Sequence, residues 1–190
     1  MRAYCSHCAY PKTTCLCSHI RRIPNSIPIH VIQDPKETKH ALNTIHIARL
    51  CLENIRIHDV SITEEEIQQI LQGGALMFPS QTSTTLPPNH TGPLFFLDAT
   101  WPKAMKIYLS NPILHSIPNY HLPNPRQSSY HIRKTSRTNA LSSLEAIGQS
   151  LEFLDAETAE IKPLYDAFHA RIAMQIQHIP KEIFHKNYPI

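Results

Sequence analysis

The chain has 190 residues, of which 42% are hydrophobic and 17% are charged, and this composition predicts a packed globular core and excludes a disordered chain. The formal net charge of +3 is too small to identify a nucleic-acid-binding protein on its own, although 13 histidines would add charge below neutral pH. No apolar run approaches the roughly 20 residues that span a bilayer, and the N-terminus carries cysteines instead of a signal segment, so we expect a soluble, cytoplasmic protein.

The first 22 residues contain four of the five cysteines and too little apolar material to be held by burial alone. These four lie within thirteen positions, at Cys5, Cys8, Cys15 and Cys17. Two closely spaced pairs of this kind predict a tetrahedral structural zinc site, and bound zinc would supply the missing folding free energy. Free or redox-active thiols and a pair of disulfides stay open as alternatives, and His7 or His19 could replace one cysteine ligand.

From residue 27 onward the chain alternates between strand and helix patterns. Short alternating or apolar runs predict strands at 27–33, 55–62 and 75–78. Apolar residues at helical spacing predict one helix over 36–53. A capping box of Thr63 and Glu66 predicts the start of the next helix, which Gly73-Gly74 would end.

The second half of the chain continues the same alternation. A polar, proline-bearing loop at 79–93 precedes an apolar strand at 94–98, and Pro102 suits the first turn of a helix that runs to residue 110. Further strands are expected at 116–123 and 130–134, and further helices at 139–155 and 156–178. Strands separated by helices indicate an α/β domain with a largely parallel sheet, in which ligands bind at the carboxyl ends of the strands.

The apolar strand at 94–98 ends in Asp98, followed by Thr100 and by Trp101, the only tryptophan. A desolvated carboxylate in this place can have its pKa tuned for proton abstraction, but Asp98 can equally cap the next helix. Thr100 has the same two roles open, ligand binding or helix capping. Trp101 is either a core residue or a surface on which a base stacks.

Two other groups of residues bear on function. Cationic side chains gather near Tyr130, at Arg126, Arg133, Lys134 and Arg137. They form either a solvated loop or a site for phosphate or carboxylate groups, and the hydroxyl-rich stretch that follows could make an anion-binding helix N-terminus. Cys51, on the predicted helix at 36–53, is expected to be a small buried residue and not a nucleophile.

Five short motifs occur in one order along almost the whole chain. They are CSHC…CLC, DPKE with Asn43-Thr44, LMFPS at 76–80, LDATW at 97–101, and YHIRK…ALSSLEAI at 130–147. Together they resemble the DTW-domain family, whose members are tRNA-uridine aminocarboxypropyltransferases. The chain departs from the family pattern at Asp34, where histidine is common, at Ala99, where glycine is frequent, and at Ser143, where threonine is usual.

The resemblance implies a SPOUT-like α/β fold, with a mostly parallel sheet, helices on both faces and a C-terminal trefoil knot. The catalytic domain would span 23–190, after the zinc-binding segment at 1–22. The implied reaction transfers the 3-amino-3-carboxypropyl group of S-adenosylmethionine to a ring nitrogen of a uridine in tRNA and releases methylthioadenosine. A SPOUT-type RNA methyltransferase and a non-catalytic, zinc-stabilised RNA-binding module are the alternatives.

The resemblance also implies roles for particular residues. Asp98 would be the general base, Thr100 would orient the substrate, and Trp101 would be a stacking wall or a support for the loop. The residues implied in binding S-adenosylmethionine are Phe78, Pro79, Ser80, Leu97, Asp98, Arg133, Ser142, Ser143 and Glu145. The expected partners are tRNA and S-adenosylmethionine, with no membrane, and the oligomeric state is left open.

Overall fold

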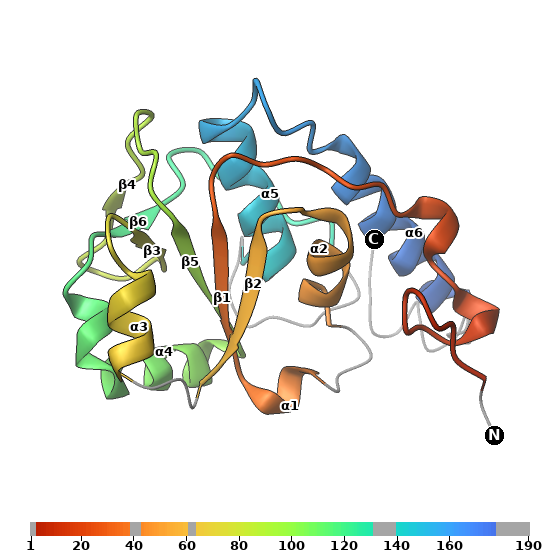
Figure 1. Ribbon diagram of the computed structural model, residues 1–190, viewed down its shortest axis with the longest axis horizontal. Coiled ribbons are helices and arrows are strands. Elements are labelled where there is room, and N and C mark those ends of the chain that lie inside the picture. Colours follow the sequence, from red (N-terminus) through yellow and green to blue (C-terminus); the bar gives the residue numbers. More distant parts are fainter. Residues whose placement is uncertain (1–2, 39–42, 61–63, 131–139, 178–190) are drawn as a thin grey trace.

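The computed structural model describes residues 3–38, 43–60, 64–130 and 140–177. Six strands form one sheet in the order β2-β1-β5-β3-β6-β4, and every neighbouring pair is parallel (Figure 1). The predicted α/β class with a parallel sheet is therefore confirmed. Within the described segments, no helix combines the length and the apolar character that crossing a bilayer requires.

The strands are short, and two of them are buried along their whole length. Their bounds are β1 (Ile29–Gln33), β2 (Ile55–Asp59), β3 (Ala75–Met77), β4 (Thr84–Thr85), β5 (Leu94–Asp98) and β6 (Asn119–His121). Strands β1 and β5 are fully buried because helices cover both of their faces, as the uniformly apolar run at 94–98 predicts. Strand β4 lies inside the segment predicted as a loop, and the strand predicted at 130–134 lies almost entirely outside the described residues.

The helices differ from the predictions mainly where they begin. Their bounds are α1 (Pro35–Thr38), α2 (Ile45–Cys51), α3 (Glu64–Ile70), α4 (Trp101–Ser110), α5 (Ser143–Leu154) and α6 (Lys162–Ile176), with 3-10 turns at Lys12–Thr14, Cys17–His19 and Pro112–His115. A single helix over 36–53 is wrong, because the Asn43 side chain accepts a hydrogen bond from the backbone N–H of His46 and α2 begins there as a separate helix. Helices α5 and α6 begin later than predicted, and Thr63 of the predicted capping box lies outside the described residues.

Alternation along the central strands divides the core into two clusters. Val31 and Phe96 point toward α2, α5 and α6, whereas Phe95 and Leu97 point toward α4 and the 3-10 turn at Pro112–His115. Helices therefore cover both faces of the sheet, as predicted. The N-terminal segment joins the first cluster through Cys8 and Leu16, which are fully buried, so it packs directly on the sheet domain.

Two histidines on neighbouring strands contact each other beside Phe95. The Nδ1 atom of His30 lies 2.9 Å from the Nε2 atom of His58, and the two rings are stacked. Burial, then the neighbouring His58 and Arg56, lowers the pKa of His30 from 6.5 to about 4, so its imidazole is neutral in the folded protein. In the unfolded chain the group takes up a proton near its ordinary pKa.

This difference predicts a loss of stability in acid. Because the unfolded state binds more protons than the folded state between pH 6.5 and about 4, the free energy of unfolding falls as the pH falls through that window. We expect His30→Leu to flatten this fall, measured by urea denaturation at pH 7 and pH 5. An unaltered pH dependence in His30→Leu would rule out His30 as the source.

Candidate functional site

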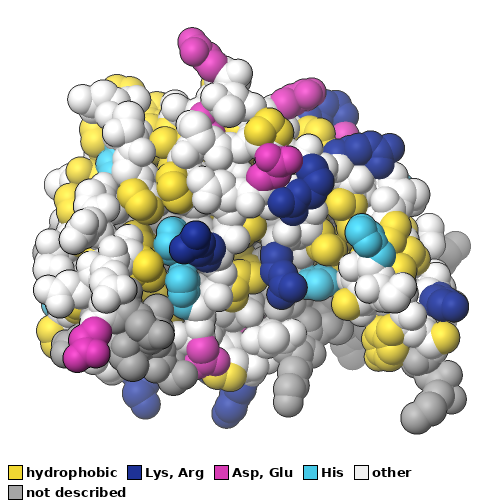
Figure 2. All heavy atoms as spheres, viewed as in Figure 1, with side chains coloured by type: hydrophobic (Ala, Val, Ile, Leu, Met, Phe, Trp, Pro, Cys, Tyr) yellow, Lys and Arg dark blue, Asp and Glu magenta, His cyan; other side chains and the backbone are white. Residues whose placement is uncertain are grey.

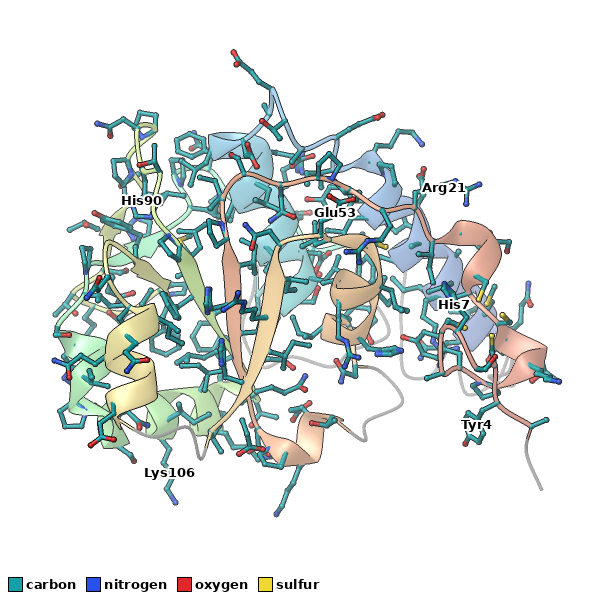
Figure 3. The ribbon with its side chains drawn as sticks, viewed as in Figure 1. Tyr4, His7, Arg21, Glu53, His90 and Lys106 are labelled. Atoms are coloured by element: carbon teal, nitrogen blue, oxygen red, sulfur yellow. The ribbon has the colours of Figure 1, made fainter. Side chains whose placement is uncertain are left out.

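The four thiols of the N-terminal segment form a compact group, with all Sγ atoms within 4.8 Å of one another. The Sγ atoms of Cys5 and Cys17 are 3.6 Å apart, and those of Cys8 and Cys15 are 3.7 Å apart. Four sulfur ligands at the usual zinc–sulfur distance of about 2.3 Å stand about 3.8 Å apart, so this group fits a tetrahedral zinc ion. Sulfur atoms lie close together near the labelled His7 in Figure 3.

Neither disulfides nor histidine ligands match this arrangement of thiols. All five cysteines lie in described residues and are free, which contradicts the two-disulfide alternative. Neither His7 nor His19 belongs to the group of metal-binding side chains that the described residues form. The backbone N–H of Cys8, and then that of His7, lowers the pKa of Cys5 to about 6, which favours the thiolate form that binds metal. Cys51 is fully buried on α2, as predicted.

The cysteine segment is attached to the domain through contacts with α2 and α6. The Nε2 atom of His46 on α2 lies 2.8 Å from the carbonyl oxygen of Cys8. The Tyr10 ring packs edge-on against His46, and the Arg171 guanidinium of α6 lies 4.3 Å from the centre of the Tyr10 ring. A metal that orders the segment therefore also orders one side of α2 and α6.

A buried carboxylate stands at the carboxyl end of the central strand β5. Asp98 is 5% exposed, and its Oδ2 and Oδ1 atoms accept hydrogen bonds from Gln33 Nε2 at 2.7 Å and from Ser143 Oγ at 2.6 Å. These side-chain contacts engage both oxygens of Asp98, so helix capping is not what positions the carboxylate. Thr100 occupies the N-cap position of α4, but its side chain caps no backbone N–H, and the residue is exposed.

Gln33 is a site residue that the sequence interpretation missed. It is the last residue of β1, it is buried, and it lies directly beside Asp98 in the parallel register. Its Nε2 atom donates to Asp98, and its Oε1 atom accepts a hydrogen bond from Thr38 at 3.1 Å. The available signal was a polar residue that directly follows the apolar pair Val31-Ile32 at the end of a strand, much as Asp98 follows Phe96-Leu97.

The DPKE motif holds the turn next to Asp98. The backbone N–H of Asp34 donates to the carbonyl oxygen of Asp98 at 3.1 Å, and Lys103 of α4 lies 3.2 Å from the Asp34 carboxylate. The backbone N–H of Lys36, and then Lys103, lowers the pKa of Asp34. Asp34 is therefore an ionised structural residue that ties β1 to the start of α4.

The start of α5 carries two buried polar residues that contact each other. Ser142 and Glu145 form a capping box, in which each side chain bonds the backbone N–H of the other residue. The Glu145 carboxylate also accepts hydrogen bonds from the Ser128 hydroxyl at 2.8 Å and from the Ser129 backbone N–H at 2.7 Å. Glu145 thereby fixes the chain before Tyr130 against α5, next to the Ser143 that contacts Asp98.

Replacing Glu145 should destabilise this junction. We expect Glu145→Ala to lower the free energy of unfolding by about 3 kcal/mol, because it removes a helix cap and leaves the buried N–H of Ser142 and the half-buried N–H of Ser129 without acceptors. Glu157 is an exposed glutamate, and Glu157→Ala should change the stability by less than about 0.5 kcal/mol. Equal denaturation midpoints for the two variants would contradict the role assigned to Glu145.

Several predicted cofactor residues lie on the opposite face of the sheet from Asp98. Phe78 and Leu97 are buried in the second core cluster, and the half-buried Trp101 packs against them, with its ring centre 5.6 Å from that of Phe78. Pro79 is exposed at the end of β3, and the Ser80 hydroxyl accepts a hydrogen bond from Asn119 at 2.9 Å. The predicted residues thus share the carboxyl edge of the sheet but divide between its two faces.

The predicted cationic cluster is only partly described. Arg133 and its neighbours at 134 and 137 lie outside the described residues. Arg126 is paired with Glu152 and donates to the Tyr165 hydroxyl at 3.1 Å. Tyr130 is buried and packs edge-on against Phe168 of α6.

Comparison with known proteins gives two matches. The DTW domain family matches residues 2–176. A protein of Drosophila melanogaster named tRNA-uridine aminocarboxypropyltransferase 2 is 30% identical over 216 aligned positions, which cover 99% of this chain and 84% of the relative. No solved structure matches the chain.

Proposed function

This chain belongs to the DTW-domain family, and we propose that it is a tRNA-uridine aminocarboxypropyltransferase that uses S-adenosylmethionine. The observation that supports this most directly is the buried Asp98 of the LDATW motif at the edge of the sheet where ligands bind. The SPOUT relationship, the C-terminal knot, the boundary between residues 22 and 23 and the cytoplasmic location are further parts of the proposal.

The reaction needs a base and a positioned electrophile. The sulfonium of S-adenosylmethionine activates the carbons bound to it, and attack by a uridine ring nitrogen on the aminocarboxypropyl carbon breaks the carbon–sulfur bond, whose electron pair returns to sulfur. Asp98 takes the proton from that nitrogen. Gln33 and Ser143 hold its two oxygens, so the carboxylate reaches the nucleophile in one orientation.

The other site residues position ligands. Thr100 is exposed beside Asp98 and orients the uridine, and Trp101 supports the loop from the opposite face. Backbone groups of Phe78, Pro79, Ser80 and Leu97, together with Arg133, hold S-adenosylmethionine. Ser142 and Ser143 shape the same edge, and Glu145 acts through the Ser128–Ser129 segment that it binds.

The tRNA would contact a surface formed by exposed arginines. Arg21 and Arg22 follow the cysteine segment, Arg49 lies on α2 and Arg56 on β2. The Arg22 guanidinium donates to the Arg49 carbonyl oxygen at 3.4 Å, so these two elements adjoin. Figure 2, viewed as in Figure 1, shows Lys and Arg side chains (dark blue) spread over the face turned toward the reader, with a few Asp and Glu side chains (magenta) between them. Phosphate contacts by such residues position an RNA without reading its sequence.

A labelling experiment tests this function. The protein is incubated with tRNA and S-adenosylmethionine labelled either in the aminocarboxypropyl group or in the methyl group, and the label in the tRNA is mapped to a nucleoside. Label from the aminocarboxypropyl group alone, on uridine, is the expected result. Label from the methyl group would identify a methyltransferase, and tRNA binding without any label would identify an RNA-binding module.

A further inference from the structure

The two oxygens of Asp98 have hydrogen-bond partners of different kinds. The Gln33 amide nitrogen donates to Oδ2 at 2.7 Å, whereas the Ser143 hydroxyl donates to Oδ1 at 2.6 Å. An amide N–H can only donate a hydrogen bond, but a hydroxyl can donate or accept. The two partners are therefore alike toward an ionised carboxylate and become different once one of its oxygens carries a proton.

The contacts of Gln33 determine which end of its amide faces Asp98. The Gln33 side chain is buried, and its Oε1 atom accepts a hydrogen bond from the Thr38 hydroxyl at 3.1 Å. A second oxygen, Asn43 Oδ1, lies 3.5 Å from the Gln33 Nε2 atom, and this oxygen already accepts from the His46 backbone N–H. A flipped amide would bring Oε1 against the oxygens of both Asp98 and Asn43. Gln33 therefore stays a donor to Oδ2.

The turn that carries Thr38 is itself held against the neighbouring elements. The Lys103 ammonium of α4 lies 3.2 Å from the Asp34 carboxylate and 3.9 Å from the Glu37 carboxylate of α1. The Asp34 backbone N–H donates to the carbonyl oxygen of Asp98 at 3.1 Å. These contacts keep α1 and the end of β1 in one position relative to Asp98, so the Gln33 amide has little freedom to move.

Ser143 has the freedom that Gln33 lacks. It is the half-buried first residue of α5, and the capping box of Ser142 and Glu145 fixes its backbone. Its hydroxyl can turn from donating to Oδ1 to accepting from a protonated Oδ1 without movement of a heavy atom. A proton on Oδ1 also makes Oδ2 the carbonyl oxygen of the acid, which still accepts from Gln33. A proton on Oδ2 would have only the donating N–H of Gln33 beside it, and an unmet buried donor is costly.

We propose that Oδ1 of Asp98 is the atom that takes up the proton, and that Gln33 and Ser143 are positioning residues that assign this task to it. This inference rests on the proposed function and adds a direction to it. The N–H bond of the uridine breaks, the proton forms a bond to Oδ1, and the electron pair stays on the ring nitrogen as the nucleophile. The nucleophile therefore approaches Asp98 from the side of α5 and not from the side of β1.

The variant Asp98→Asn tests the assignment at neutral pH. An amide resembles an acid with a proton on one oxygen, because its NH₂ group stands where the O–H would be and its oxygen where the carbonyl would be. We expect the new oxygen to face the Gln33 N–H and the new NH₂ group to face the Ser143 hydroxyl. In NMR spectra, the NH₂ protons should show nuclear Overhauser contacts to the β-protons of Ser143. Contacts of the NH₂ protons to the Gln33 side-chain amide instead would overturn the assignment.

Transfer rates test the role of Ser143. We expect Ser143→Ala to slow transfer roughly tenfold, because the O–H formed on Oδ1 then lacks its acceptor, and Ser143→Thr to restore the rate because it keeps the hydroxyl. Ser26→Ala is the matched control, since the Ser26 hydroxyl also donates to a buried carboxylate, that of Asp155, at 2.6 Å. It should lower the stability and leave the rate per folded molecule unaltered. A Ser143→Ala protein with the wild-type rate would contradict the proposal.

The two tests separate this inference from the proposed function. The NMR contacts in Asp98→Asn require no tRNA and no S-adenosylmethionine, so they decide between the two oxygens whether or not transfer occurs. The opposite amide orientation in a protein that transfers the group would overturn the oxygen assignment alone. A wild-type protein that transfers no group would overturn the proposed function and, with it, the uridine as the source of the proton.

Discussion

Asp98→Asn should slow transfer of the aminocarboxypropyl group by about 10²- to 10⁴-fold, the usual contribution of a general base. An amide cannot accept the proton, but it can keep the local contacts. Its oxygen can accept from Gln33, and its NH₂ group can donate to the Ser143 hydroxyl, which rotates to accept. We therefore expect the fold and the affinity for S-adenosylmethionine to stay close to those of the wild type. Single-turnover rates and calorimetry measure the two effects separately.

Asp155 provides a matched control for this variant. Asp155 is also 5% exposed, and its carboxylate accepts hydrogen bonds from the Ser26 N–H at 2.7 Å and from the Ser26 hydroxyl at 2.6 Å. Ser26 precedes β1, so this contact lies near the amino ends of the strands, whereas Asp98 lies at the carboxyl end of β5. Asp155→Asn should lower the melting temperature and leave the transfer rate per folded molecule unaltered. If Asp98→Asn also lowered only the melting temperature, Asp98 would be a structural residue and the proposed mechanism would be wrong.

The sheet was predictable because its central strands carry a local signal. The run LFFL at 94–97 is apolar throughout and follows the turn residues Gly92 and Pro93, and β5 (Leu94–Asp98) covers this run in the structure. The helix over 36–53 was mispredicted because its apolar spacing continues across Asn43, whereas a side-chain hydrogen bond to His46 starts a new helix there. The helical spacing of apolar residues shows which face of a helix is buried, but it does not show a side-chain hydrogen bond that starts a new helix within the pattern.

The sequence predicted individual site residues on single elements, but it did not predict the contacts between residues of different elements. The sequence places Asp98 at the end of β5 and Gln33 at the end of β1, but only the parallel register brings them side by side. The contact of Ser143 with Asp98 spans 45 positions, and Glu145 reaches Ser128 across 17 positions. No local pattern encodes such pairs. Successive side chains of a strand point to opposite faces of the sheet, so Leu97 and Asp98 lie on different faces although they are neighbours in the sequence.

Removing one of the four clustered thiols, which we expect to bind zinc, should have the largest effect on stability. Cys8 is fully buried, and its thiol lies 3.7 Å from that of Cys15. We expect Cys8→Ser to lose the bound metal and to destabilise the protein by about 3–5 kcal/mol, which corresponds to about 6–20 °C in melting temperature for a chain of this size. The loss should be smaller than for an isolated zinc finger, because Leu16 still packs in the first core cluster. Metal content by mass spectrometry and melting by calorimetry measure the two effects.

Cys51 separates the metal from the general cost of altering a buried cysteine. It is fully buried on α2 but does not belong to the thiol group, so Cys51→Ala should keep one zinc per chain and cost only about 1 kcal/mol. A chelator should reproduce the effect of Cys8→Ser in the wild type and in Cys51→Ala alike. A wild type that contains no metal as purified, and whose melting temperature a chelator does not lower, would show that these thiols hold no structural zinc.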